Sequence, residues 1–300
     1  MSLADWQAAL RSVKAFTPNC AVQFIGGEPM IVPWFFELIS FCRDQGIDWG
    51  VITNGSRLTE ARVQDIVAAR PLNIDVSLDS RLSASHDFLR GVAGSMEKVS
   101  QGIERLVEER ARTGSRFIIR LKPTVTGHTI GALLDLVDWV ETLPGVLVDF
   151  SPVRLWRDAD IQALYPQTPQ QLSELKVVVD KLIQRKTAGA PIETSVAKLA
   201  GMIEHFEHRP NQHGVGQCRV GLRSIDIRPN GDVNHCWKFT RIGNLREASM
   251  AKIWRNAVRM ELVEQTVSCD LFKTTCSTSC HAHRTLRQDV ARGLRYLRRR

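Results

Sequence analysis

Two spacings of apolar residues alternate along the first half of the chain, and each predicts a different element. Between residues 3 and 16 apolar side chains recur every three or four positions, which predicts an amphipathic helix. Ala21 to Ile25 is a short apolar run that stops on two glycines, as a buried strand does when it leads into a loop. The same two patterns then predict further helices over 33–42, 59–69, 95–111 and 130–141, and further strands over 49–53, 73–78, 116–125 and 146–151.

This repeated alternation of helix and strand with short connections is typical of a parallel sheet with helical crossovers. The five predicted strands are too few to close an eight-stranded barrel, so we expect an α/β fold with a partial barrel. Polar residues follow the ends of these strands, at Glu28, Asn54, Ser77, Asp79 and Lys122. Barrels of this kind bind their ligands at the carboxyl ends of the strands, so we expect the site there.

The pattern changes after residue 155. Helical spacing predicts a linker of helices over 156–209, and short β-like runs with turns and cysteines begin near 210. The run from Cys218 to Cys236 predicts a β-hairpin, because Pro229-Asn230-Gly231-Asp232 is a turn sequence between two alternating segments. We therefore divide the chain into a partial barrel (1–155), a helical linker (156–209), a cysteine-rich domain (210–283) and a basic terminal helix (284–300).

Cysteine usage indicates a metal centre in the last third of the chain. Five of the seven cysteines lie there, at Cys218, Cys236, Cys269, Cys276 and Cys280. Clustered cysteines in a reducing compartment favour metal binding over disulfides. Four thiolates suit either zinc or an iron–sulfur cluster, and the histidines His235, His281 and His283 keep zinc in contention.

Composition and charge are typical of a globular protein and argue against a membrane-spanning segment. The chain is 43% hydrophobic and 24% charged, and no apolar stretch approaches the ~20 residues that span a bilayer. No signal peptide precedes the first helix, so we expect a cytoplasmic protein. Residues 284–300 contain seven arginines and one aspartate, and so account for six of the eight net positive charges. The high pI is a property of this tail and is weak evidence for a nucleic-acid partner.

Several motifs in this order resemble the radical SAM superfamily. Gly26-Gly27-Glu28-Pro29, Thr53-Asn54-Gly55 and Ser77-Leu78-Asp79 follow three successive strands, as the corresponding family motifs do. The hairpin from Cys218 to Cys236 is similar to the SPASM/twitch extension of that family, and so is Ile242-Gly243-Asn244-Leu245 before Lys252-Ile253-Trp254. The resemblance covers residues 3 to 283.

The resemblance implies a partial (β/α)6 barrel without its first strand, followed by a small α+β twitch/SPASM-like domain. It implies that Gly26, Gly27 and Glu28, with Pro29, bind the methionyl amine of S-adenosylmethionine. Asn54, Ser77 and Asp79 would line the ribose and carboxylate, with Arg120, or less directly Arg90, as partner of the methionyl carboxylate. One auxiliary [4Fe-4S] cluster would be bound by Cys218, Cys236, Cys276 and Cys280, with Cys269 as a substitute ligand.

The family binds its catalytic cluster through Cys-x3-Cys-x2-Cys, upstream of the glycine loop, and these 300 residues contain no such motif. Cys20 and Cys42 are the only cysteines before Cys218, and we expect both to be core residues. Our interpretation is an N-terminally incomplete chain, with a degenerate relative as the alternative. Such a chain would bind at most one cluster, and its 21–25 strand would be an open sheet edge.

The activity that the resemblance implies is reductive cleavage of S-adenosylmethionine and hydrogen-atom abstraction by the 5′-deoxyadenosyl radical. The substrate would be a peptide, a protein or a small molecule, and an electron donor such as flavodoxin or ferredoxin would be required. A non-catalytic zinc or iron–sulfur protein is the second hypothesis. A nucleic-acid modifier that uses the arginine tail is the third.

Overall fold

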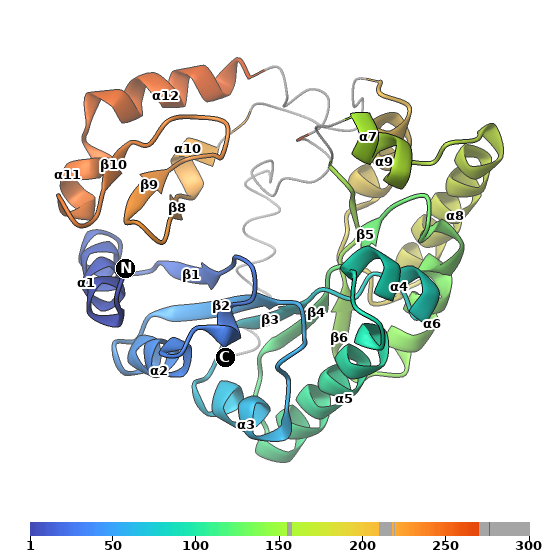
Figure 1. Ribbon diagram of the computed structural model, residues 1–300, viewed down its shortest axis with the longest axis horizontal. Coiled ribbons are helices and arrows are strands. Elements are labelled where there is room, and N and C mark those ends of the chain that lie inside the picture. Colours follow the sequence, from blue (N-terminus) through green and yellow to red (C-terminus); the bar gives the residue numbers. More distant parts are fainter. Residues whose placement is uncertain (155–157, 210–217, 219, 270–275, 277–300) are drawn as a thin grey trace.

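The computed structural model describes residues 1–154, 158–209, 218, 220–269 and 276. A five-stranded parallel sheet in the order β1-β2-β3-β4-β6 forms the framework of the first half (Figure 1). Its strands are β1 (Ala21–Phe24), β2 (Asp48–Thr53), β3 (Asn73–Val76), β4 (Ile118–Leu121) and β6 (Val146–Val148). The sheet is curved but not closed, which confirms the partial α/β barrel.

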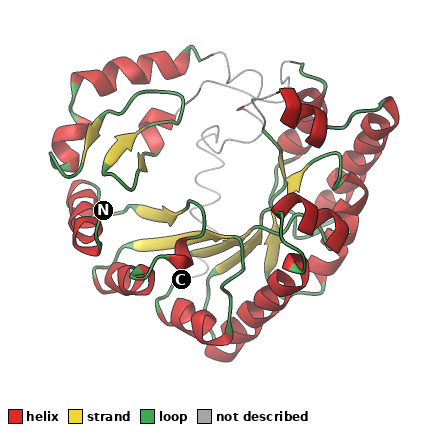
Figure 2. Ribbon diagram, in the orientation of Figure 1, coloured by secondary structure: helices red, strands yellow, loops and turns green. Residues whose placement is uncertain are grey.

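The helices of this part lie mostly along the outer face of the curved sheet, and those between its strands form the crossovers (Figures 1 and 2). In chain order they are α1 (Leu3–Phe16), the 3-10 turn η1 (Pro29–Ile31), α2 (Phe35–Asp44), α3 (Glu60–Ala68), α4 (Ser83–Arg90), α5 (Ser95–Thr113), the 3-10 turn η2 (Ile130–Ala132), α6 (Leu133–Glu141), α7 (Asp158–Leu164), α8 (Pro169–Thr187) and α9 (Val196–Phe206). Several begin at side-chain caps. In α1 the Ser2 hydroxyl accepts from the Asp5 N–H, and the Asp5 carboxylate accepts from the Ser2 N–H.

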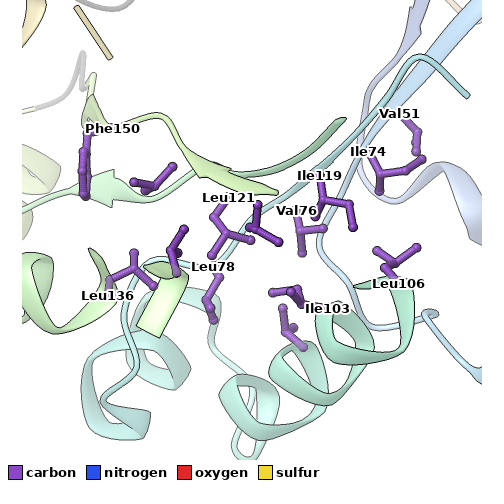
Figure 3. Packing of buried hydrophobic residues seen from close by; sticks show 14 of the residues in the cluster. Val51, Ile74, Val76, Leu78, Ile103, Leu106, Ile119, Leu121, Leu136 and Phe150 are labelled. Atoms are coloured by element: carbon purple, nitrogen blue, oxygen red, sulfur yellow. The ribbon is translucent and has the colours of Figure 1, made fainter. Parts of the chain in front are cut away.

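The main hydrophobic core fills the space between the sheet and these helices (Figure 3). Alternate residues of β3 and β4, such as Ile74, Val76 and Ile119, are fully buried against Ile103 and Leu106 of α5. Burying each such side chain contributes about 1.5–3 kcal/mol. Because side chains alternate along a strand, the residues between them lie on the opposite, inner face of the sheet.

The sheet has one open edge and one extended edge within the described residues. β1 pairs only with β2, and it is half-exposed rather than buried as its apolar run suggests, because it lies at the edge. Beyond β6, the Val148 N–H donates to the Pro191 carbonyl (2.9 Å), and Val148 accepts from the Glu193 N–H (2.7 Å). The segment around Ile192 therefore continues the sheet in parallel for one bridge.

Two predicted strands are each divided in two. Residues 116–125 form β4 and then β5 (Thr124–Val125), and residues 146–151 form β6 and then β7 (Ser151–Pro152). β5 and β7 pair with each other in a separate two-stranded sheet. Pro123 lies at the break and has no N–H to donate, so the ladder of the main sheet cannot pass it.

The C-terminal part forms a second, smaller unit beside α1 (Figure 1). It comprises α10 (Val220–Arg223), β8 (Asp226–Ile227), β9 (Asp232–Asn234), β10 (Gly243–Asn244), α11 (Met250–Trp254) and α12 (Ala257–Val267). The predicted hairpin is present as antiparallel β8 and β9, although a short helix occupies its first residues. The predicted domain boundary near 210 and the terminal helix over 284–300 fall on residues outside the described ranges.

Helix α1 joins this unit to the barrel. Leu10 packs into the main core, while Val13 belongs to a second hydrophobic cluster formed by the C-terminal unit. The Met250 N–H donates to the Ser12 hydroxyl (2.8 Å), and the rings of Phe16 and Trp254 lie 5.5 Å apart. None of the helices described has the length and apolar character needed to cross a bilayer.

Candidate functional site

The glycine loop after β1 leaves its backbone accessible. Gly26 has a φ of 140°, a conformation that favours glycine, and a Cβ on either Gly26 or Gly27 would have no heavy atom within 4 Å. Ile25, which precedes them, is 60% exposed. No packed side chain fills this corner, so a ligand can approach the backbone of both glycines.

Glu28 directly follows the two glycines and is buried at 7% exposure. Its carboxylate accepts hydrogen bonds from the Asn54 N–H (2.7 Å), the Thr53 hydroxyl (2.9 Å) and the Met30 N–H (3.2 Å). The first two donors belong to the end of β2 and the third to η1. The carboxylate therefore ties the ends of two neighbouring strands together, by hydrogen bonds to a charged acceptor.

The next two predicted positions lie along the same edge of the sheet. The Asn54 side chain accepts from the Ser56 N–H (2.9 Å), which closes the turn after β2. Gly55 follows with a φ of 76°, and a Cβ there would meet Val99 at 2.9 Å. The Ser77 N–H donates to the Thr53 carbonyl (2.9 Å). The structure thus brings Glu28, Asn54 and Ser77 together at the carboxyl ends of β1, β2 and β3.

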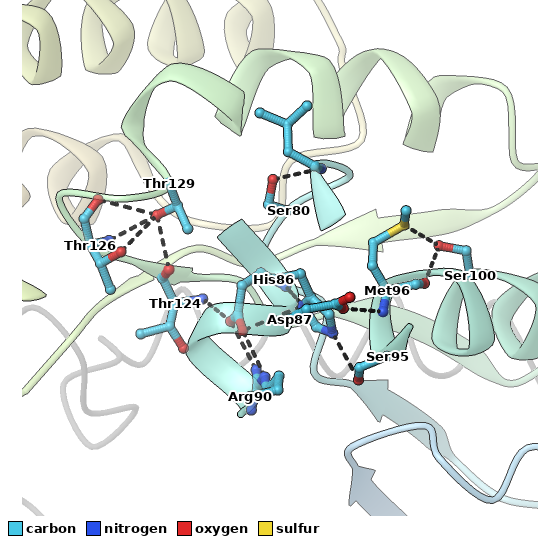
Figure 4. A network of polar contacts seen from close by, with 12 residues as sticks. Ser80, His86, Asp87, Arg90, Ser95, Met96, Ser100, Thr124, Thr126 and Thr129 are labelled. Carbon is cyan, nitrogen blue, oxygen red and sulfur yellow. Dashed lines mark hydrogen bonds and ion pairs between the residues drawn. The ribbon is translucent and has the colours of Figure 1, made fainter. Parts of the chain in front are cut away.

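Asp79 attaches α4 to the sheet through a polar network to which His86, Arg90 and Thr124 belong (Figure 4). Its carboxylate is 2% exposed, forms an ion pair with Arg90 (2.7 Å) and accepts from the Thr124 N–H (2.9 Å). The Asp79 N–H donates to Nδ1 of the fully buried His86 (3.2 Å). That bond requires Nδ1 to be unprotonated, and burial lowers the pKa of His86, so its ring is neutral.

Arg120 lies on the inner face of the sheet at 5% exposure. Its guanidinium donates to Asp75 of β3 (2.6 Å) and to Glu193 of the segment beyond β6. Burial acts to lower the pKa of Arg120, but the carboxylates of Asp75 and Glu193 more than offset it, and the pKa lies above its ordinary value. Arg120 is therefore a fixed positive charge inside the barrel.

Further polar side chains extend this inner face. Asn73 donates to Asp75 (2.8 Å) and, across β2, to Gln23 (3.1 Å). Gly50 lies between them, and a Cβ there would be 2.4 Å from the Asn73 Oδ1. Near the strand ends, Lys122 forms an ion pair with Asp149 (2.5 Å). Neither Asp75 nor Glu193 was expected from the sequence to belong to the site. Asp75 could have been found, since it alternates with apolar residues of β3, whereas Glu193 lies 73 residues from Arg120.

The C-terminal hairpin is held by its turn. Gly231 has a φ of 92°, and a Cβ there would be 2.7 Å from the Asn244 Oδ1. The Asn244 amide donates to the Asn230 carbonyl (3.2 Å) and to Asp232 (3.0 Å). This turn fixes β8 against β9, and Cys236 follows β9 by two residues.

Four of the five predicted metal-ligating cysteines are described. Cys218, Cys236, Cys269 and Cys276 are all half-buried, and the Lys238 ammonium lies 3.6 Å from the Cys269 sulfur. Cys280, His281 and His283 lie outside the described residues. Within the described ranges, no three acidic, histidine or cysteine side chains come close enough together to form a metal site. Cys42 is fully buried in the main core, as expected, and Cys20 packs half-buried against the second cluster.

Both regions have features that fit the cofactors of the expected family. The glycine corner is open beside a buried carboxylate, as a cationic amine requires. In the C-terminal unit, the Nε of the buried Arg259 has no hydrogen-bond partner among the described residues. An orphaned cationic group in the same unit as half-buried thiols fits the surroundings of an anionic cluster.

Residues 218–281 match a family model described as SPASM, an iron-sulfur cluster-binding domain. AdoMet-dependent heme synthase of Nitratidesulfovibrio vulgaris is 30% identical over 251 residues, covering 80% of this chain and 66% of the relative. The enzyme of the same name from Methanosarcina barkeri is 25% identical over 240 residues (77% and 67%). Mycofactocin maturase MftC of Mycobacterium ulcerans is 24% identical over 239 residues (77% and 60%). The chain spans about two thirds of the length of these curated relatives.

Solved structures show the same fold. Streptococcus suis SuiB matches with a TM-score of 0.67 and 17% identity, over 94% of this chain and 67% of SuiB. The structure of anSMEcpe with bound AdoMet and a peptide matches with a TM-score of 0.64 and 14% identity, over 100% of this chain and 88% of the other.

Proposed function

Because the chain belongs to the radical SAM superfamily of enzymes and has a SPASM-type iron–sulfur domain, we propose that it binds S-adenosylmethionine at the glycine corner and one auxiliary [4Fe-4S] cluster in its C-terminal unit. Its reaction would be hydrogen-atom abstraction from an organic substrate. The observation that carries the proposal is the accessible backbone of Gly26 and Gly27 above the buried Glu28, at the carboxyl edge of a parallel sheet.

Within this proposal, the backbone carbonyls of the glycine loop receive the methionyl ammonium. The Glu28 carboxylate already accepts three hydrogen bonds, so it acts mainly by fixing the loop and by adding negative charge nearby. Pro29 begins η1 and limits the freedom of the loop. Asn54 and Ser77, on the same edge, line the ribose.

Asp79 and Arg120 have protein partners that refine their proposed roles. Asp79 is saturated by Arg90 and the Thr124 N–H, so it positions α4 rather than binding the ligand itself. Arg120 supplies a permanent positive charge toward the methionyl carboxylate, although it shares that charge with Asp75 and Glu193. The substrate lies against the inner face, which Lys122 and Asp149 also line.

For the auxiliary cluster we propose Cys218, Cys236, Cys276 and Cys280 as ligands, with Cys269 as the substitute. When bound, the cofactors supply one-electron chemistry and hydrogen-atom abstraction. The protein contributes position, exclusion of water and the charges that set the reduction potential. We also propose that the boundaries 1–155, 156–209, 210–283 and 284–300 mark the functional domains.

Two substrate classes are named among the relatives. The heme synthases are named for the formation of heme, whereas the PqqA peptide cyclase of Xanthomonas euvesicatoria and SuiB bound to the precursor peptide SuiA indicate peptides. We propose a peptide or a small molecule of this kind as substrate, with flavodoxin or ferredoxin as electron donor. The lack of Cys-x3-Cys-x2-Cys in these 300 residues favours a second candidate, a non-catalytic iron–sulfur or zinc protein.

Metal analysis distinguishes an iron–sulfur protein from a zinc protein, and an assay for 5′-deoxyadenosine tests for catalysis. The chain is purified anaerobically, reconstituted with iron and sulfide, and assayed for iron, sulfide, zinc and 5′-deoxyadenosine. We expect about four iron and four sulfide ions per chain, and no 5′-deoxyadenosine from the chain as printed. Stoichiometric zinc without iron would refute the iron–sulfur proposal. Efficient formation of 5′-deoxyadenosine would refute the requirement for the Cys-x3-Cys-x2-Cys motif.

A further inference from the structure

The C-terminal unit contains a buried arginine that has no carboxylate partner among the described residues. Arg259 of α12 is 5% exposed, and its guanidinium lies over the Trp254 ring, 3.6 Å from the ring centre. One nitrogen donates to the Gly221 carbonyl (3.0 Å) and another contacts the Met260 sulfur (3.4 Å). Its Nε has no hydrogen-bond partner within the described ranges.

Burying a charged guanidinium costs free energy unless an anion lies close to it. Burial lowers the pKa of Arg259, and no carboxylate of the described residues acts to raise it. The ring of Trp254 and one carbonyl compensate a buried guanidinium only in part. By contrast, the buried Arg120 of the barrel has two carboxylates. The surroundings of Arg259 are therefore those of a cation that lacks its counter-charge.

The neighbours of Arg259 show where such an anion belongs. Gly221, which accepts its hydrogen bond, follows Cys218 by three residues. His235, which immediately precedes Cys236, packs on Gly221, because its ring carbons lie 3.4 and 3.5 Å from where a Gly221 Cβ would be. Arg259 thus lies beside the two segments that carry Cys218 and Cys236.

We propose that Arg259 is the counter-charge of the auxiliary cluster and raises its reduction potential. This inference rests on the proposed function, since it requires a thiolate-ligated cluster at Cys218 and Cys236. A [4Fe-4S] cluster with four thiolates carries a net charge of −2 when oxidised and −3 after it accepts one electron. A fixed positive charge stabilises the more negative state more strongly. Arg259 therefore acts through electrostatics and positions no substrate.

The test is a redox titration of the full reconstituted chain, followed by electron paramagnetic resonance with dithionite as reductant. Arg259→Gln and Arg259→Met remove the charge, and the second keeps an apolar stem against Trp254 if the first does not fold. Arg259→Lys keeps the charge. Arg255→Gln makes the same charge change at an exposed position of the same unit.

We expect both neutral variants to shift the midpoint potential to more negative values, and Arg259→Lys and Arg255→Gln to stay close to wild type. Neutral variants that assemble the cluster but keep the wild-type potential would overturn the inference. An equal shift in Arg255→Gln would also overturn it, because the effect would then be one of net charge. A wild-type chain that assembles no cluster would instead remove the proposed function, and with it this inference.

Discussion

Replacing Glu28 tests whether its carboxylate holds the glycine corner together. In Glu28→Ala the Thr53 hydroxyl and the Met30 and Asn54 N–H groups lose their acceptor. Hydrogen bonds to a charged group contribute about 1.5–3 kcal/mol each, and a buried donor left unpaired costs about 1–3 kcal/mol. Thr53 and Met30 are buried, whereas water can reach the half-buried Asn54. We therefore expect Glu28→Ala to lower the free energy of unfolding by about 3 kcal/mol.

Glu28→Gln gives an intermediate result, because its carbonyl oxygen can still accept from one donor while its NH2 group faces the others. We expect a loss of about 2 kcal/mol. The measurement is urea unfolding followed by far-UV circular dichroism, with the slope checked for constancy. Glu104→Ala, at an exposed position in the middle of α5, is the control. A Glu28→Ala variant within about 0.5 kcal/mol of Glu104→Ala would refute the reasoning.

Three further predictions follow from particular contacts. Gly50→Ala should lower the free energy of unfolding by about 1–3 kcal/mol, because its Cβ would separate the Gln23–Asn73 bridge; an unchanged denaturation midpoint would contradict this. Gly27→Ala should change stability by less than about 0.5 kcal/mol, since nothing lies within 4 Å of the added Cβ; marked destabilisation would show that the corner is packed. Burial lowers the pKa of His205 to about 4, whereas an unfolded histidine titrates near 6.5, so only the unfolded chain takes up this proton between those values. The free energy of unfolding should fall by up to about 3 kcal/mol as pH drops from 6.5 to 4, and this decrease should be absent in His205→Gln. Identical dependence of the free energy of unfolding on pH in the two proteins would contradict the prediction.

The strands and the glycine corner could be predicted from the sequence because both depend on local patterns. An apolar run that ends in glycines specifies a strand and its loop, whatever the rest of the chain does. Cys42 was likewise predicted correctly, since it lies on the apolar face of a helical pattern and is fully buried. The turn at Gly231 depends only on a backbone conformation that glycine adopts readily.

Features that depend on tertiary contacts could not be predicted. Helix α4 has no apolar stripe that would predict it, because Phe88 is exposed and His86 is its buried residue. It is held instead by the ion pair between Arg90 and Asp79 and by the buried His86. Helix α7 lies within the predicted linker and was not predicted as a separate helix. It is only seven residues long, which is too short for a clear helical spacing of apolar residues.

The charge balance inside the barrel is also a tertiary property. Arg120 could be proposed as a ligand-binding residue from its place on a strand, but its pairing with Asp75 and Glu193 joins three distant segments. The orphaned charge of Arg259 is equally invisible in the sequence, where it is one of many arginines. Only its burial over Trp254 and its lack of a carboxylate partner in the described residues distinguish it.

Equilibrium binding of S-adenosylmethionine to the reconstituted chain tests the central claim most directly. Gly27→Leu fills the open corner without forcing a left-handed backbone, and Ala111→Leu adds the same bulk at an exposed site on α5. The account predicts saturable binding to wild type and to Ala111→Leu, and affinity at least tenfold weaker for Gly27→Leu, or about 1.4 kcal/mol. Equal affinity in all three proteins, or no binding to the wild-type chain, would contradict it.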